Sequence, residues 1–170
     1  MSQTTITHEG AFQKDQRDGI NANFTELYGA VYNAVAPVAV TASTVTLASG
    51  THSNRVTTLS RAAGIAVTLP AATGTGAWYD LIVITTVTSN STTITCAGSD
   101  TLQGQAYVLS DDAAAVLAYD AAGTATVITL NGTTKGGYVG HRIKLVDIAS
   151  GKWFVMSIGK ATGTEATPFS

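Results

Sequence analysis

The hydrophobic period of this chain changes once, near Pro37, and the change restricts the folds open to it. Before Pro37 the apolar residues recur at spacings of three and four, and after it small apolar residues alternate with Thr. The first period is one face of an α-helix, and the second is that of half-buried strands. We therefore expect an all-β fold, a compact β-sandwich or small β-barrel, preceded by one amphipathic α-helix.

The helix is expected over residues 18–36. Asn21 or Asn23 can cap its start, with Glu26 completing a capping box after Asn23, and Pro37 ends it. A helix of about four turns is marginal alone in water, so its apolar face needs a partner. That partner is the chain's own β domain, a three-chain bundle or another protein. The interaction face comprises Ile20, Phe24, Leu27, Tyr28, Val31 and Tyr32.

Both ends of the chain are expected to lie outside the β domain. Residues 1–17 are too hydrophilic to pack alone and form a polar N-terminal arm that orders on a partner. Residues 161–170 are rich in Thr and Gly and form a flexible C-terminal tail, unless a neighbour captures Phe169. The β domain itself is expected over residues 37–160.

The β domain shows short alternating runs separated by turn residues about every 8–12 residues, as in sandwiches and small barrels. The last pair, 142–148 and 152–155, is predicted to be a hairpin with Ile143, Leu145 and Trp153 facing the core. The Gly-rich segments 73–76 and 132–137 are interpreted as hairpin loops. The expected strands are 38–47, 55–59, 65–69, 77–87, 92–96, 105–109, 113–119, 124–130, 141–148 and 153–158.

The charge content limits the partners. Only 12% of the residues are charged and the net charge is −2, so no basic surface is available to bind nucleic acid. So low a charge also protects sheet edges weakly, which favours burial in a homo-oligomer. The polar start gives no signal peptide, and no apolar run is long enough to span a membrane. We expect a protein that is assembled in the cytoplasm.

Catalytic and metal-binding patterns are not evident, so we expect no enzyme, no cofactor and no metal. The three histidines, His8, His52 and His141, have no ligand spacing. The single cysteine, Cys96, lies in an alternating run and is interpreted as a small buried side chain. Four acidic residues invite comparison with a glycosidase pair or a hard-cation site, but they are better explained as turn residues. They are Asp100, Asp111, Asp112 and Asp120.

Two further groups of residues are candidate interaction sites. Asp80 interrupts an apolar strand, and a buried carboxylate needs a partner, for which Arg142 and Arg61 are candidates, within the chain or across a subunit boundary. A carbohydrate-binding module would use exposed aromatic side chains, and surface glycans are the least favoured partner. Those aromatic candidates are Trp78, Tyr79 and Tyr107.

Several segments resemble virion proteins of tailed bacteriophages. Residues 18–28, Asp-Gly-Ile-Asn-Ala-Asn-Phe-Thr-Glu-Leu-Tyr, are similar to a segment near the start of many phage tail and fibre subunits. The body resembles small structural proteins of the capsid-decoration type, chiefly in its Leu-Pro-Ala-Ala-Thr-Gly-Thr-Gly loop and its later Trp hairpin. The segments of the body that carry the resemblance are 61–76, 100–104, 131–137, 147–154 and 166–170.

The resemblance implies a β-rich homotrimer on the outer capsid surface of the virion. There it would bind the major capsid protein and stabilise the shell against internal DNA pressure. The helical segment leaves an alternative open, a head or tail fibre subunit or adaptor with tail or portal components as partners. The resemblance supplies no catalytic residues.

Overall fold

The computed structural model describes residues 18–24, 36–111 and 115–170. The chain divides into two units, residues 1–36 and 37–170. In the first unit, residues 18–24 are helical, with Ile20 and Phe24 one turn apart and Phe24 66% exposed. The rest of the predicted interaction face lies outside the described residues, as does the polar arm 1–17. Those interaction-face residues are Leu27, Tyr28, Val31 and Tyr32.

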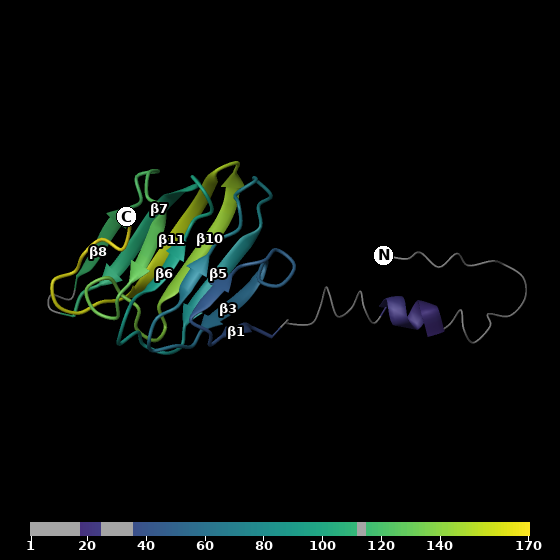
Figure 1. Ribbon diagram of the computed structural model, residues 1–170, viewed down its shortest axis with the longest axis horizontal. Coiled ribbons are helices and arrows are strands. Elements are labelled where there is room, and N and C mark those ends of the chain that lie inside the picture. Colours follow the sequence, from purple (N-terminus) through teal and green to yellow (C-terminus); the bar gives the residue numbers. More distant parts are fainter. Residues whose placement is uncertain (1–17, 25–35, 112–114) are drawn as a thin grey trace, which may run out of the picture. The chain divides into compact units, whose positions relative to one another are not determined.

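The second unit is an all-β domain whose strands form two sheets around a shared core, which makes it a sandwich (Figure 1). The large sheet has seven strands in the order β1-β3-β5-β10-β11-β7-β8, and the small sheet has four in the order β2-β4-β6-β9. The strands are β1 (Val38–Val40), β2 (Thr44–Thr46), β3 (Arg55–Leu59), β4 (Ala66–Thr68), β5 (Trp78–Val83), β6 (Thr92–Thr95), β7 (Thr101–Leu109), β8 (Val116–Asp120), β9 (Val127–Leu130), β10 (Arg142–Ala149) and β11 (Lys152–Lys160).

The first six strands wind between the sheets. β1, β3 and β5 are parallel neighbours in the large sheet, and β2, β4 and β6 are parallel neighbours in the small sheet. Parallel neighbours need a crossover, and here each crossover passes through a strand of the opposite sheet. The expectation of hairpin loops is therefore wrong for the Gly-rich segments 73–76 and 132–137, which connect one sheet to the other.

The predicted last hairpin is confirmed. β10 and β11 are antiparallel, with a register shift between Asp147 and Ala149. This hairpin inserts into the middle of the large sheet, where β10 pairs with β5 and β11 pairs in parallel with β7. β10 and β11 thus separate β5 from β7, and both strands are central.

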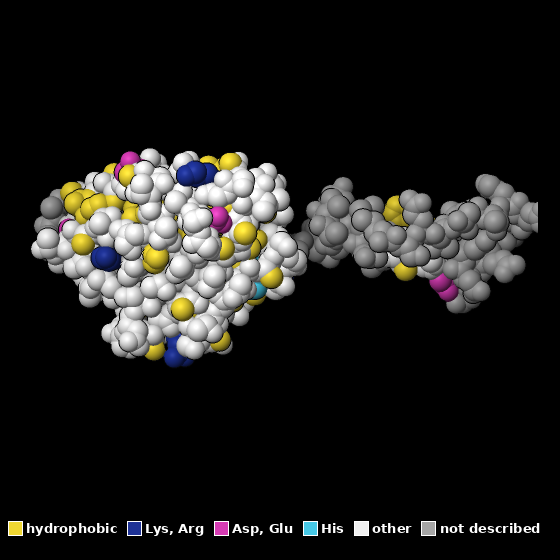
Figure 2. All heavy atoms as spheres, turned by 45° about the horizontal axis from the view of Figure 1, so that its top comes forward, with side chains coloured by type: hydrophobic (Ala, Val, Ile, Leu, Met, Phe, Trp, Pro, Cys, Tyr) yellow, Lys and Arg dark blue, Asp and Glu magenta, His cyan; other side chains and the backbone are white. Residues whose placement is uncertain are grey.

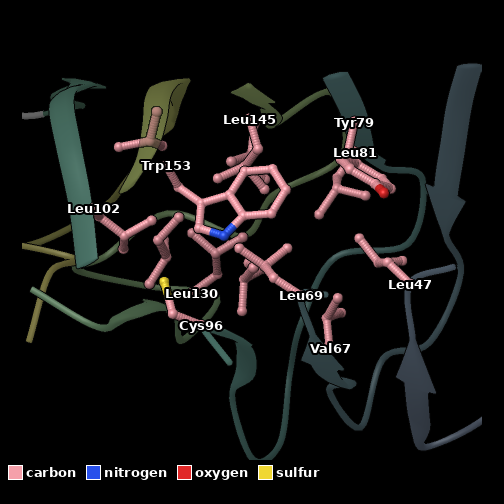
Figure 3. Close-up of a cluster of buried hydrophobic side chains, with 14 of the residues drawn as sticks. Leu47, Val67, Leu69, Tyr79, Leu81, Cys96, Leu102, Leu130, Leu145 and Trp153 are labelled. Atoms are coloured by element: carbon pink, nitrogen blue, oxygen red, sulfur yellow. The ribbon is translucent and has the colours of Figure 1, made fainter. Parts of the chain in front are cut away.

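The core lies between the sheets and is aliphatic around one aromatic pair. The rings of Trp153 and Tyr79 meet edge to face with centroids 5.7 Å apart. Ile143 and Leu145 are fully buried, as the alternation of β10 predicts. Figure 3 shows Trp153 among Leu side chains of both sheets, with Cys96 at the side. The indole Nε1 has no hydrogen-bond partner among the described residues, so the observed contribution of Trp153 to the core comes from its ring contacts.

The C-terminal residues are docked, which differs from the flexible tail expected over residues 161–170. The amide of Thr129 donates to the carbonyl of Pro168 at 2.8 Å, and Val127 and Ser170 exchange backbone hydrogen bonds of 2.9 and 3.1 Å. The Phe169 side chain is buried. An edge strand presents unpaired backbone groups, and the tail satisfies those of β9 while it buries Phe169. The partner that captures Phe169 is the chain's own β9.

Candidate functional site

The outward face of the large sheet carries a contiguous row of exposed apolar side chains. On β11 these are Met156 and Ile158, and register places Ile158 opposite Tyr107 of β7. Two residues further along β7, Leu109 pairs with Val116 of the edge strand β8. All five are 38–61% exposed. We call Met156, Ile158, Tyr107, Leu109 and Val116 the apolar stripe.

Charged side chains are sparse around this stripe. In Figure 2 the few charged groups of the β domain are scattered, and apolar side chains gather on the side that carries β7 and β8. One register row crosses the stripe from β10 to β8, in the order Lys144, Met156, Gln105, Asp120. The stripe is thus bordered by a cation on the β10 side and by a carboxylate on the β8 side.

Asp80 and Arg142 lie on the same face and pair with each other. The guanidinium donates from Nε to Oδ1 at 2.8 Å and from Nη2 to Oδ2, a bidentate geometry. The carboxylate side chain is 4% exposed and the guanidinium side chain 54%. The hydrogen bond and the charge of Asp80 raise the pKa of Arg142 against a smaller opposing effect of burial. The sequence left Arg142 and Arg61 as candidate partners of Asp80. The structure shows an ion pair between Asp80 and Arg142 within one chain.

The aromatic candidates for sugar binding do not form a platform. Tyr79 is buried in the core, where burial and the nearby Asp147 carboxylate raise its pKa, so its assignment as an exposed contact is wrong. The reason is strand parity, since Tyr79 alternates with the outward Trp78 and Asp80. Trp78 is partly covered, with the Lys144 ammonium 5.5 Å from its ring centroid. Tyr107 is exposed and belongs to the apolar stripe.

Asp147 is the most heavily hydrogen-bonded carboxylate that the structure describes, and no sequence pattern marks it as a functional residue. It accepts backbone bonds from Thr73, Gly74 and Thr75 at 2.7–3.0 Å and hydroxyl bonds from Thr75 and Thr73 at 2.7 and 3.3 Å. Burial alone would raise the pKa of Asp147, but these hydrogen bonds outweigh it and lower the pKa to about 2. Asp147 therefore fastens the 73–76 loop to β10.

His141 is a second buried polar anchor, directly before β10. Its Nδ1 accepts a hydrogen bond from the amide of Gly137 at 3.1 Å, so the proton of the neutral ring lies on Nε2 and is donated to Ser157 Oγ at 2.8 Å. Burial lowers the pKa of His141 to about 4. A Cβ at Gly136 or Gly159 would collide with the imidazole. This histidine fixes the 132–140 loop against β11.

The other acidic candidates that the structure describes accept hydrogen bonds from backbone amides. Asp100 accepts from the amide of Ala72 at 2.7 Å, Asp111 from Gly163 at 3.2 Å and Asp120 from Ala122 at 3.2 Å, which agrees with their interpretation as turn residues. Asp112 and His8 lie outside the described residues. Within the described ranges, no three His, Cys, Asp or Glu side chains gather as metal ligands.

The other two residues with candidate chemistry are also buried. His52 accepts a hydrogen bond at Nδ1 from the amide of Ala48 at 3.0 Å. Cys96 is a buried free thiol, as the alternation predicts. Burial and the Asp100 charge raise the pKa of this thiol to about 11, so it stays protonated at neutral pH.

Comparison with protein-family models, with curated proteins and with solved structures gives no match to this chain. In the described part of the chain, no helix has the length and apolar character that crossing a bilayer requires.

Proposed function

We propose that this protein is a structural component of a bacteriophage virion, a homotrimeric capsid decoration protein that binds the outer capsid surface and stabilises the shell. The observation that carries the proposal is the apolar stripe on the large sheet. Large exposed apolar patches on soluble proteins mark association surfaces, and a structural subunit of a particle needs such surfaces.

The polar groups of the β domain support the same role. Asp147 and His141 are both saturated by bonds that hold loops to β10 and β11. Asp80 is held by Arg142 in a bidentate pair. Such groups stabilise the sandwich and leave little capacity for proton transfer. The Leu-Pro-Ala-Ala-Thr-Gly-Thr-Gly loop, which carries the resemblance to decoration proteins, is also the loop that wraps the Asp147 carboxylate.

A tail or fibre adaptor is the second candidate, and the helical unit favours it. Residues 18–24 are helical with Ile20 and Phe24 on one face, and Phe24 is exposed. A trimeric collar built from this face would cover Phe24. Immunogold labelling of virions separates the two candidates, because label on the head supports decoration and label confined to the tail supports the adaptor.

The proposal is tested by adding the purified protein to capsids that lack it. We expect co-sedimentation with the capsids and a higher temperature of DNA release. A capsid preparation with a saturating amount of bovine serum albumin is the control for non-specific protection. Capsids that neither bind the protein nor gain resistance to heat would contradict a decoration role.

A further inference from the structure

The apolar stripe is continuous across three strands of the large sheet. Ile158 pairs with Tyr107 and Leu109 pairs with Val116, while Met156 precedes Ile158 by two residues on the same face of β11. Lys160 borders the stripe at the end of β11, where its ammonium lies 5.7 Å from the ring centroid of Tyr138. Neighbouring strands are about 4.8 Å apart, so the stripe spans about 10 Å across the sheet.

The two sides of the stripe carry opposite charge. On the β5 and β10 side, Asp80 and Arg142 neutralise each other, which leaves Lys144 as the charge of that side. On the β8 side stands Asp120, in the same register row as Lys144 and three strands away. Asp120 uses Oδ1 for the amide of Ala122, and a carboxylate can accept further bonds.

This charge pattern points to further copies of the same chain as the occupant. We propose that copies of this protein associate through the large sheet, with the apolar stripe buried and Lys144 of one copy facing Asp120 of the next. The β10 side of one copy then meets the β8 side of its neighbour. Because the same surface lies on both copies, and Lys144 and Asp120 of each face Asp120 and Lys144 of the other, the contact is isologous and gives a two-fold pair. The inference goes beyond the homotrimer of the proposed function and adds a pairwise contact between copies of the chain.

Chemical complementarity explains why a copy of the chain fits this surface. A partner must present an apolar centre with an anion opposite Lys144 and a cation opposite Asp120, and the stripe with its own borders meets both conditions. The net charge of the whole chain is only −2, so copies repel one another weakly. The buried stripe would supply most of the affinity, and the charge pair would fix the relative orientation.

The first experiment substitutes a stripe residue on the central strand β11 in the full-length chain. We expect Met156→Glu to weaken self-association at least about tenfold, because it places a carboxylate in the buried stripe and, directly opposite Lys144 in register, competes with Asp120 of the other copy for that ammonium. Ile148→Glu is the matched control, since Ile148 is 47% exposed against 46% for Met156 and lies at the bulge between Asp147 and Ala149, at the far end of β10. Mass is measured by multi-angle light scattering over a range of concentrations, and folding by circular dichroism.

The second experiment tests whether the occupant is another copy. Lys144→Glu would place two anions together and weaken self-association about fivefold. Adding Asp120→Lys to that variant restores an opposite-charge pair and should restore the wild-type mass. Recovery in the double variant supports contact between copies. Loss without recovery, or equal loss in the Ile148→Glu control, would overturn the assignment of the interface.

The outcomes also separate this inference from the proposed function. If the wild-type chain assembles and Met156→Glu assembles equally well, the interface is elsewhere and the homotrimer survives. A wild-type chain that stays monomeric at every concentration overturns both the interface and the homotrimer. Binding to capsids, measured independently, still decides whether the protein decorates a shell.

Discussion

The two sheets share one core, yet their outward faces have different chemistry. No strand of the small sheet contains an ionisable residue, and its outward face presents two rows of small side chains. Across the four strands the rows are Thr44, Ala66, Thr93 and Thr129, and Thr46, Thr68, Thr95 and Val127. The large sheet instead carries the Asp80–Arg142 pair, Lys144 and the apolar stripe.

The chain has few charged residues, and its two outward faces use them differently. Thr favours strands and binds water through its hydroxyl without adding charge, so the small sheet can face solvent as it stands. Its β9 edge is already covered by the tail through Val127 and Thr129. The ionisable anchors adjoin the large sheet, which is also the face that we propose to associate.

Trp153→Ala should destabilise both sheets together, by about 3–5 kcal/mol. Trp153 is fully buried on β11 and packs on Tyr79 and on Leu side chains of both sheets. We expect one cooperative unfolding transition at a lower denaturant midpoint, measured in parallel by circular dichroism and by the fluorescence of Trp78. Two separated transitions would show that the sheets are stabilised independently, contrary to a shared core.

His141 should make the domain lose stability in mild acid. Its folded pKa of about 4 lies below the usual 6.5, so between these values the unfolded chain binds more protons. Stability is complete above pH 6.5 and falls by up to about 3 kcal/mol as the pH drops to 4. Urea unfolding at a series of pH values measures this slope. The slope should disappear in His141→Asn, whereas His52→Asn serves as the control and should retain it.

Asp147 should add a second loss of stability at lower pH. Its folded pKa of about 2 lies below the usual 3.8, so its contribution is present above pH 3.8 and is lost as the pH falls towards 2. We expect Asp147→Asn to cost about 2 kcal/mol at pH 7 and to increase hydrogen exchange at Gly74 and Thr75. Asp111→Asn is the control, because that exposed carboxylate accepts one bond from Gly163. Equal costs for the two substitutions would contradict the anchoring role.

The smallest effects should separate the two outward faces. Thr68→Lys on the small sheet and Tyr107→Lys on the large sheet both lie on exposed strand positions, and each should change the free energy of unfolding at low concentration by less than about 0.5 kcal/mol. Only Tyr107→Lys should reduce the mass of the assembled protein. A reduction by Thr68→Lys as well would show that the threonine face also takes part in association.

Features that depend on local interactions along the chain could be predicted from the sequence, and features that depend on distant contacts could not. Alternation within a strand is local, so the inward direction of Ile143 and Leu145 and the last hairpin were predicted correctly. Burial of Cys96 follows from the same parity. Tyr79 was misassigned because neighbouring positions of one strand face opposite sides, and the apolar centre of β5 gives no marker of which side is the core.

The sequence alone locates most of the strands and turns and shows the near absence of charge, but residues 38–47, expected as one strand, form β1 and β2 in different sheets. Which strands are neighbours is visible only in the three-dimensional structure. Pairing joins residues far apart in the chain, and many alternative strand pairings would have similar local interaction energies. The parallel winding of β1–β6, the docking of Phe169 on β9 and the loop gathered by Asp147 all depend on such distant contacts. The apolar stripe does too, since Met156, Tyr107 and Val116 become one surface only when register aligns β11, β7 and β8.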